Sequence, residues 1–220
     1  MSTEFKKRIF TSIFLIFLLS AMFFYSFIMI ISLIIIAMIV WVEFYALISK
    51  IILGNSLNDK FFRFLYKTLS LFYLSLLVYS IFAIESYYPN LKLYLLYSVL
   101  VAILSDTGGL LFGKTFKGKK LTKISPNKTI SGSIGSFIFS LTLVPFFYEE
   151  LFGHAFFISI IITILISLVS QLGDLFISYL KRKAKVKNTS DILPGHGGFL
   201  DRVDGIIFAI PIGIFLFNLI

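Results

Sequence analysis

Four polar side chains in the C-terminal half recur at a spacing that a helix would turn into one stripe. They are an amide, a carboxylate, a hydroxyl and an ammonium, at Gln171, Asp174, Ser178 and Lys181. Residues three and four positions apart share one face of a helix, and the other faces of this segment are apolar. Exposing such a stripe to lipid would be very costly, so we expect it to face a bundle interior or a wet cavity.

A second polar stretch reads PGHGGFLDRVD and occupies residues 194–204. Asp201 and Asp204 lie one turn apart if a helix begins near Phe199. Carboxylates beside a basic, glycine-rich loop suit a Mg²⁺–nucleotide site, because Mg²⁺ favours one or two carboxylates together with substrate phosphates. The basic run 181–187 could neutralise the remaining phosphate charge. The alternative role for its middle lysines is to hold anionic lipid headgroups.

A third stretch, residues 106–132, combines glycines, lysines and hydroxyls. Glycines let the backbone approach a ligand closely, and lysines and hydroxyls beside exposed amides suit phosphate oxygens. The Walker pattern G-x-x-x-x-G-K-[ST] is absent. The alternative is a turn-rich loop that carries positive charge only for topology. The candidate residues for binding substrate or phosphate here are Asp106, Lys114, Ser125, Lys128 and Thr129.

Another acid, Glu43, lies in an apolar segment of the N-terminal half. Ionisable groups within a membrane are costly and usually functional. Structural pairing with a nearby Lys or Arg is the alternative for Glu43, so its type and position leave both roles open.

The elements that position these residues are predicted to be membrane-spanning helices. The chain has 220 residues, of which 58% are hydrophobic, and its mean hydropathy is +0.97, whereas soluble domains are about 45–50% apolar. A spanning helix needs about 20 mostly apolar residues. We therefore predict an all-α, polytopic membrane bundle of about seven helices, with a weak break near Tyr25. The predicted segments are 9–24, 27–48, 66–84, 93–112, 132–148, 155–179 and 205–220.

The positive charges agree with this order of helices. Lys and Arg concentrate in short cytoplasmic loops. With a cytoplasmic N-terminus, the inside segments hold all of the 20 Lys and Arg residues except Lys67 and Lys92. Lys67 lies at the inner border of its helix, so only Lys92 falls on the outside. These inside segments are 1–8, 49–65, 113–131 and 180–204. We divide the chain into about three N-terminal membrane helices, 1–92, and a second membrane domain, 93–220, which carries the candidate site and the cytoplasmic loops 113–131 and 180–204.

The composition excludes several site types. The chain has no cysteine and two histidines, which excludes disulfides, thiolate metal sites, cysteine nucleophiles and multi-histidine metal sites. The basic residues at positions 6–8 are also compatible with a signal peptide, but the apolar stretch after them is too long and no small-x-small cleavage site follows.

The motifs together resemble the phosphatidate cytidylyltransferases, or CDP-diacylglycerol synthases. The longest match is Ser178-x-x-Lys181-Arg182, then Lys187, then Pro194-Gly-His-Gly-Gly-x-x-Asp201-Arg-x-Asp204. Upstream matches are Asp106-Thr-Gly-Gly, Gly113-Lys114, Ser125-Pro-x-Lys128-Thr129-x-x-Gly132 and Gln171-x-Gly-Asp174-Leu, with a fainter echo at Trp41-Val-Glu43-Phe-Tyr45. The chain departs from the family at Asn188, where an Asp is usual, and at Ser131, where Glu is frequent. Asp191 is the candidate substitute for the missing acid.

The resemblance implies a Mg²⁺-dependent reaction in which CTP and phosphatidate give CDP-diacylglycerol and pyrophosphate. It implies catalytic roles for Asp174, Ser178, Lys181 and Asp201, with Asp174 and Asp201 as metal ligands and Asp204 as a further candidate. The implied substrate contacts, beyond those of the third stretch, are Arg182, Lys187, His196 and Arg202. A merely structural role is the alternative for His196.

The expected partners are CTP, phosphatidate and the lipid bilayer, without nucleic acid, and a homodimer is an option. The expected location is the inner cell membrane, with the site facing the cytoplasm. One alternative function is a CTP-dependent lipid (polyprenol) kinase. The other is a membrane transporter without enzymatic activity, although transporter carboxylates lie near the bilayer midplane and these acids lie at predicted inner helix ends.

Overall fold

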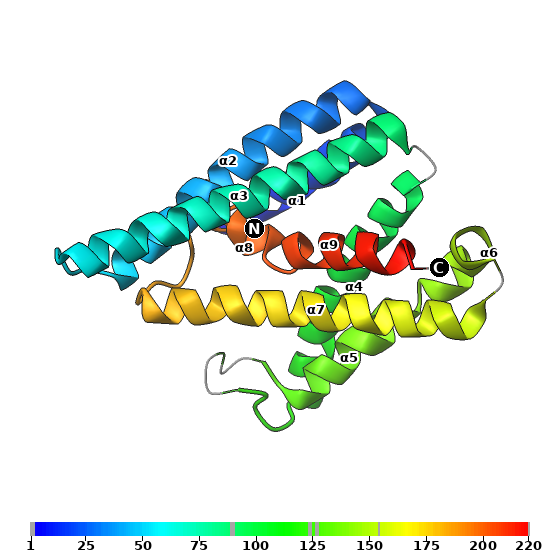
Figure 1. Cartoon of the computed structure of the whole chain (residues 1–220). Coiled ribbons are helices and arrows are strands. Elements are labelled where there is room, and N and C mark those ends of the chain that lie inside the picture. Colours follow the sequence, from blue (N-terminus) through cyan, green and yellow to red (C-terminus); the bar gives the residue numbers. More distant parts are fainter. Residues whose placement is uncertain (1–2, 89–90, 123–124, 126–127, 154, 220) are drawn as a thin grey trace. The chain divides into compact units, whose positions relative to one another are not determined.

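The computed structural model describes residues 3–88, 91–122, 125, 128–153 and 155–219, and within these the chain is helical, without a strand (Figure 1). This confirms the all-α prediction. The helices are α1 (Thr3–Phe24), α2 (Ser26–Ile51), α3 (Leu57–Tyr87), α4 (Lys92–Phe116), α5 (Ile130–Leu141), α6 (Val144–Phe152), α7 (Phe156–Lys183), α8 (Leu200–Val203) and α9 (Ile206–Phe217).

The predicted number of membrane spans is not confirmed by the described residues. Among the described residues, α2, α3, α4 and α7 are long and apolar enough to cross a membrane, and α5 with α6 would make a fifth span. The predicted count of seven is therefore not confirmed, although every predicted segment contains a helix. The apolar part of α1, Ile9–Phe24, is shorter than a span, and α9 has only 12 residues.

Two helix boundaries differ from the sequence-based expectation for local reasons. Helix α3 begins at Leu57, well before predicted residue 66, because Ser56 and Asp59 cap each other: the Asp59 amide donates to Ser56 Oγ at 3.1 Å and the Ser56 amide to Asp59 Oδ2 at 3.2 Å. This reciprocal pair is a capping box. The predicted helix 132–148 is instead bent by 54° between α5 and α6, where Pro145 at the start of α6 cannot continue the helix before it.

The described residues form two compact units. The first comprises Met1–Tyr87 and Leu180–Val203, and the second comprises Tyr88–Tyr179 and Asp204–Ile220. The division predicted between residues 92 and 93 concerns the roles of the segments and stays a prediction.

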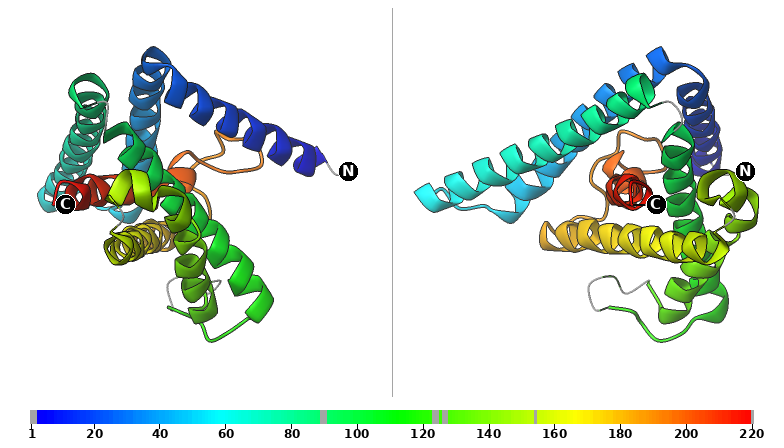
Figure 2. Two further views of the ribbon diagram at one scale, coloured as in Figure 1. Left: turned by 90° about the vertical axis from the view of Figure 1, so that its right-hand side faces the viewer. Right: turned by 45° about the vertical axis from the view of Figure 1, so that its right-hand side comes forward.

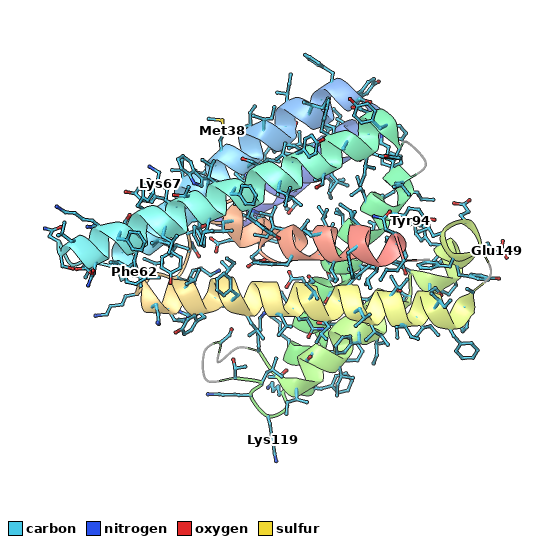
Figure 3. The ribbon with its side chains drawn as sticks, viewed as in Figure 1. Met38, Phe62, Lys67, Tyr94, Lys119 and Glu149 are labelled. Atoms are coloured by element: carbon cyan, nitrogen blue, oxygen red, sulfur yellow. The ribbon has the colours of Figure 1, made fainter. Side chains whose placement is uncertain are left out.

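In the first unit, α2 and α3 run alongside each other (Figures 1 and 2). The Lys67 ammonium lies 5.1 Å from the centre of the Trp41 ring and 4.8 Å from that of Tyr45, and the Trp41 indole donates to the Lys67 carbonyl at 3.1 Å. A cation over two aromatic faces stabilises this pairing. Apolar side chains project outward from both helices, among them Met38 and Phe62 (Figure 3), as a lipid-facing surface requires.

In the second unit, α4 packs against α5 and α9. Its core contains Tyr97, Val101 and Ile166, with hydroxyl pairs buried among them. Tyr97 Oη lies 2.6 Å from Thr163 Oγ1, and the hydroxyl oxygens of Ser105 and Ser167 are 2.9 Å apart. Small hydroxyl residues at such interfaces let membrane helices approach and hydrogen-bond each other, which fixes α7 against α4.

Candidate active site

The second unit holds a polar group that we call the Asp174 cluster, made of Lys128, Ser133, Gln171, Asp174 and Ser178. Its geometry begins with the crossing of α4 and α5. A Cβ atom on Gly108 would lie 2.5 Å from the Gly135 carbonyl oxygen, so only glycine permits this approach. The crossing sets where α5 starts and therefore where the preceding loop runs.

Thr129 is the N-cap of α5, since its hydroxyl accepts a hydrogen bond from the Gly132 amide at 3.0 Å. The loop before it closes on itself, because the Leu121 amide donates to the Lys128 carbonyl at 2.8 Å and the Ile130 amide to the Lys119 carbonyl at 2.9 Å. The closed loop presents the Lys128 side chain to α7.

The Asp174 carboxylate joins this loop to the polar face of α7. Asp174 Oδ2 pairs with the Lys128 ammonium, and the Ser178 hydroxyl donates to Asp174 Oδ1 at 3.3 Å. One turn earlier, the Ser133 hydroxyl donates to Gln171 Oε1 at 2.6 Å. The Lys128 and Asp174 side chains are 26% and 24% exposed. The ion pair is partly exposed, so a substrate or a cation can reach it.

The first unit holds a second polar group, the Asp201 cluster, made of Glu43, Lys181, Thr189, Ser190 and Asp201. The segment between α7 and α8 turns sharply at Gly195 and Gly197, whose φ angles are +76° and +86°, a region that favours glycine. The Leu193 amide donates to the Gly197 carbonyl at 2.8 Å. This turn places Gly198 and Asp201 beside Lys181, near the end of α7.

Both Asp201 oxygens accept hydrogen bonds. Oδ1 accepts from the Lys181 ammonium at 2.6 Å, and Oδ2 accepts from the amides of Thr189 at 2.8 Å and Gly198 at 3.0 Å. The Thr189 hydroxyl also lies 3.0 Å from Oδ2. Burial raises the pKa of the Asp201 carboxyl, but the hydrogen bonds from Lys181, Thr189 and Gly198 outweigh it, and the pKa lies below its ordinary value.

The remaining predicted residues of the second unit lie on α4, on the loop after it and just before α9. Asp106 and Lys114 are exposed on α4. Ser125 is buried, and its amide donates to Thr122 Oγ1 at 3.3 Å. Asp204 is half-buried, and its Oδ1 accepts from the Gly205 amide at 2.9 Å.

In the first unit, Arg182 and Lys187 are exposed. Arg202 donates twice to the His196 carbonyl, at 3.1 and 2.7 Å, which braces the glycine-rich turn. His196 Nε2 lies 3.4 Å from the Ser12 hydroxyl, and the buried Thr11 hydroxyl donates to the Pro194 carbonyl at 2.9 Å. Sequence reasoning missed Thr11 as a support of this turn.

The carboxylates of Asp174 and Asp201 could each supply one oxygen ligand to a hard divalent cation. Among the residues that the structure describes, no three Asp, Glu or His side chains gather as a ready metal cage. Asp174 Oδ2 and Asp201 Oδ1 each face a lysine ammonium, a position that another cation could take. Because Mg²⁺ is usually held by one or two carboxylates plus substrate phosphates, these oxygens fit that ion.

Comparison with known proteins finds a matching family and several similar proteins. A model of the cytidylyltransferase family matches residues 1–220. A phosphatidate cytidylyltransferase of Staphylococcus haemolyticus is 45% identical over 122 residues, which are 54% of this chain and 46% of the relative.

Further relatives carry the same name. One from Staphylococcus aureus is 47% identical over 122 residues, or 54% of this chain and 46% of its own. One from Rickettsia typhi is 45% identical over 116 residues, or 49% and 50% of the two chains. The chain thus spans about half the length of the curated relatives it matches.

Proposed function

Because the chain belongs to the cytidylyltransferase family, we propose that it transfers the CMP moiety of CTP to phosphatidate, which yields CDP-diacylglycerol and pyrophosphate. The family match over the whole chain carries the nucleotidyl-transfer part of this proposal. The lipid acceptor is supported by the relatives, which are phosphatidate cytidylyltransferases by name.

The proposed chemistry needs no strong general base. A phosphomonoester has a second pKa of about 6, so the phosphatidate phosphate is already a dianionic nucleophile near neutral pH. One of its oxygens forms a bond to the α-phosphorus of CTP, and the bond from that phosphorus to the oxygen bridging to the β-phosphorus breaks. Pyrophosphate leaves with the electron pair of that bond. The catalyst must therefore orient two polyanions and reduce their repulsion.

We assign these tasks by residue type. Asp174 and Asp201 are the proposed Mg²⁺ ligands, and Asp204 is a further candidate. Bound Mg²⁺ would supply charge neutralisation at the phosphates. The ammonium groups of Lys128 and Lys181, which face these carboxylates, would turn to phosphate oxygens once a cation takes their place. Ser178 is proposed to orient Asp174. The proposed further contacts to substrate or phosphate are Asp106, Lys114, Ser125, Thr129, Arg182, Lys187, His196 and Arg202.

The protein is a membrane protein, and we propose that it lies in the inner cell membrane with its polar loops in the cytoplasm, where CTP is available. The basic residues of those loops support this orientation. The chain has no cysteine, so single cysteines report topology without background. Lys119 and Asn188 are both exposed, and Lys119 extends away from its loop in Figure 3.

Lys119→Cys and Asn188→Cys should both resist an impermeant thiol reagent in intact, right-side-out cells. Both should react once the membrane is opened. Labelling of one of them in intact cells would assign the two loops to opposite sides of the membrane and contradict the orientation.

The activity itself is tested by stoichiometry. Purified protein with phosphatidate, CTP and Mg²⁺ should form one CDP-lipid and one pyrophosphate per CTP consumed, with no consumption when phosphatidate is omitted. Release of CDP together with phosphorylation of a lipid hydroxyl would identify a lipid kinase instead.

A further inference from the structure

We infer that Glu43, on α2, is a positioning residue for the proposed transfer reaction: its carboxyl group fixes the two chain segments that hold Asp201. This inference rests on the proposed function for its catalytic consequence. Glu43 lies far in the sequence from residues 178–204, the longest stretch of matching motif, and it touches neither proposed substrate in the roles assigned above.

The carboxyl group of Glu43 gathers four donors. Oε1 accepts from the Ser190 hydroxyl at 2.5 Å and from the Phe199 amide at 3.1 Å. Oε2 accepts from the Leu200 amide at 2.7 Å and lies 3.0 Å from the Thr189 hydroxyl. Each oxygen thus meets one hydroxyl from the segment 189–190 and one backbone amide at the start of α8.

The two carboxyl groups of the cluster are linked through Thr189. Its hydroxyl lies 3.0 Å from Glu43 Oε2 and 3.0 Å from Asp201 Oδ2, and its amide donates to the same Asp201 oxygen. A hydroxyl carries one proton and donates to one oxygen at a time. Displacing Glu43 therefore changes the hydrogen bonding of Asp201 directly.

The burial of Glu43 and the packing around it indicate that the fold accommodates this carboxyl group specifically. Glu43 is 2% exposed, and a carboxyl group placed in an apolar helix is costly unless its oxygens are satisfied. A Cβ atom on Gly198 would lie 2.0 Å from Thr189 Oγ1 and 2.6 Å from Glu43 Oε2. The glycine at position 198 therefore makes room for the Glu43 carboxyl and for its Thr189 partner.

Neither a purely apolar residue nor an amide can replace this group. In Glu43→Gln, one oxygen becomes an NH₂ donor, and either orientation of the amide turns that donor toward the amide of Phe199 or of Leu200. Opposed donors disrupt the cluster while side-chain size is preserved. Small displacements of reacting groups have large effects on rate. Misplacement of Asp201 should therefore lower the turnover number more than it lowers the affinity for substrate.

The test compares Glu43→Gln with Val40→Ala, a packing control on the same helix whose side chain is also 2% exposed. In Glu43→Gln, amide hydrogen exchange in peptides covering 189–203 should accelerate at least about tenfold, and kcat should fall at least about tenfold with a smaller change in KM for CTP. Val40→Ala should show neither effect at a comparable loss of thermal stability. If Glu43→Gln does not fold, Glu43→Asp replaces it in the comparison with Val40→Ala. Glu43→Asp keeps both carboxylate oxygens but draws them back by one methylene group, so the same increase in exchange and the same fall in kcat are expected.

Unchanged exchange in Glu43→Gln, or faster exchange with unchanged kcat, would overturn the inference, as would equal effects in Val40→Ala. Absence of CDP-lipid formation by the wild-type protein would instead reject the proposed function. The exchange result would then still decide whether Glu43 fixes the segment.

Discussion

The two polar clusters contain the same pair of residue types, an aspartate and a lysine, but they hold the aspartate in different ways. Asp174 has Lys128 on one oxygen and a 3.3 Å hydrogen bond from Ser178 on the other, and its side chain is 24% exposed. Asp201 has Lys181 on one oxygen and two backbone amides on the other, and its side chain is 7% exposed. We infer that Asp174 is the more available carboxylate, whereas Asp201 also organises the chain around it.

The difference originates in the chain segments involved. Asp174 lies in the middle of a regular helix, where backbone amides are already used by the helix and only side chains remain as partners. Asp201 lies in a four-residue helix after a glycine-rich turn, where free amides are available. The same substitution should therefore have different consequences in the two clusters.

Asp201→Asn should have the larger effect, because it removes both an ion pair and an acceptor of backbone amides. We expect turnover to fall at least about 10²-fold, the scale on which single electrostatic groups matter in catalysis, and the free energy of unfolding to fall by about 2 kcal/mol, as for a hydrogen bond to a charged group. Turnover and thermal unfolding measure the two effects. A variant with wild-type stability would contradict the organising role.

The stability part of this effect should depend on pH. Because the folded-state pKa of Asp201 lies below its ordinary value of 3.8, its ionised form stabilises the fold above that pH. This contribution should decrease as the pH falls from 3.8 through the folded-state pKa. Unfolding of the wild type and of Asp201→Asn should therefore converge in acid, and a constant difference across that range would exclude this origin.

Asp174→Asn should lower turnover by a similar factor, at least about 10²-fold, without loosening the chain. Hydrogen exchange of the surrounding peptides should stay at the wild-type rate, since in the described structure the Asp174 carboxylate accepts hydrogen bonds from side chains and from no backbone amide. The rate loss should persist at limiting Mg²⁺. Near-full activity under that condition would remove Asp174 from the proposed metal ligands.

The smallest effect is expected at the departure from the family motif. Asn188 and Asp191 are both exposed, on either side of the two hydroxyl residues that bind Glu43. If an acid is needed there, Asp191→Asn should lower turnover by about twofold to fivefold, and Asn188→Asp should leave it unchanged or raise it. A silent Asp191→Asn in folded protein would show that this acid is dispensable.

Several local features of the chain were predictable from the sequence, whereas the long-range contacts of the site were not. The break at Tyr25 was predicted from sequence, and the helical spacing of Gln171, Asp174 and Ser178 predicted their common face on α7. The start of α3 was not predicted, although Ser56 and Asp59 have the spacing of a capping box. No local pattern, however, connects Glu43 with residues about 150 positions later. Those hydrogen bonds depend on how α2 meets the turn before α8.

The fate of the α-phosphate of CTP tests the proposed function most directly. With purified protein, phosphatidate and Mg²⁺, CTP labelled at the α-phosphate should give labelled lipid, and CTP labelled at the γ-phosphate should give labelled pyrophosphate and unlabelled lipid. Asp174→Asn should lower both signals together, by the same factor of at least about 10². Lipid labelled from the γ-phosphate, with the α-label released as CDP, would contradict the account.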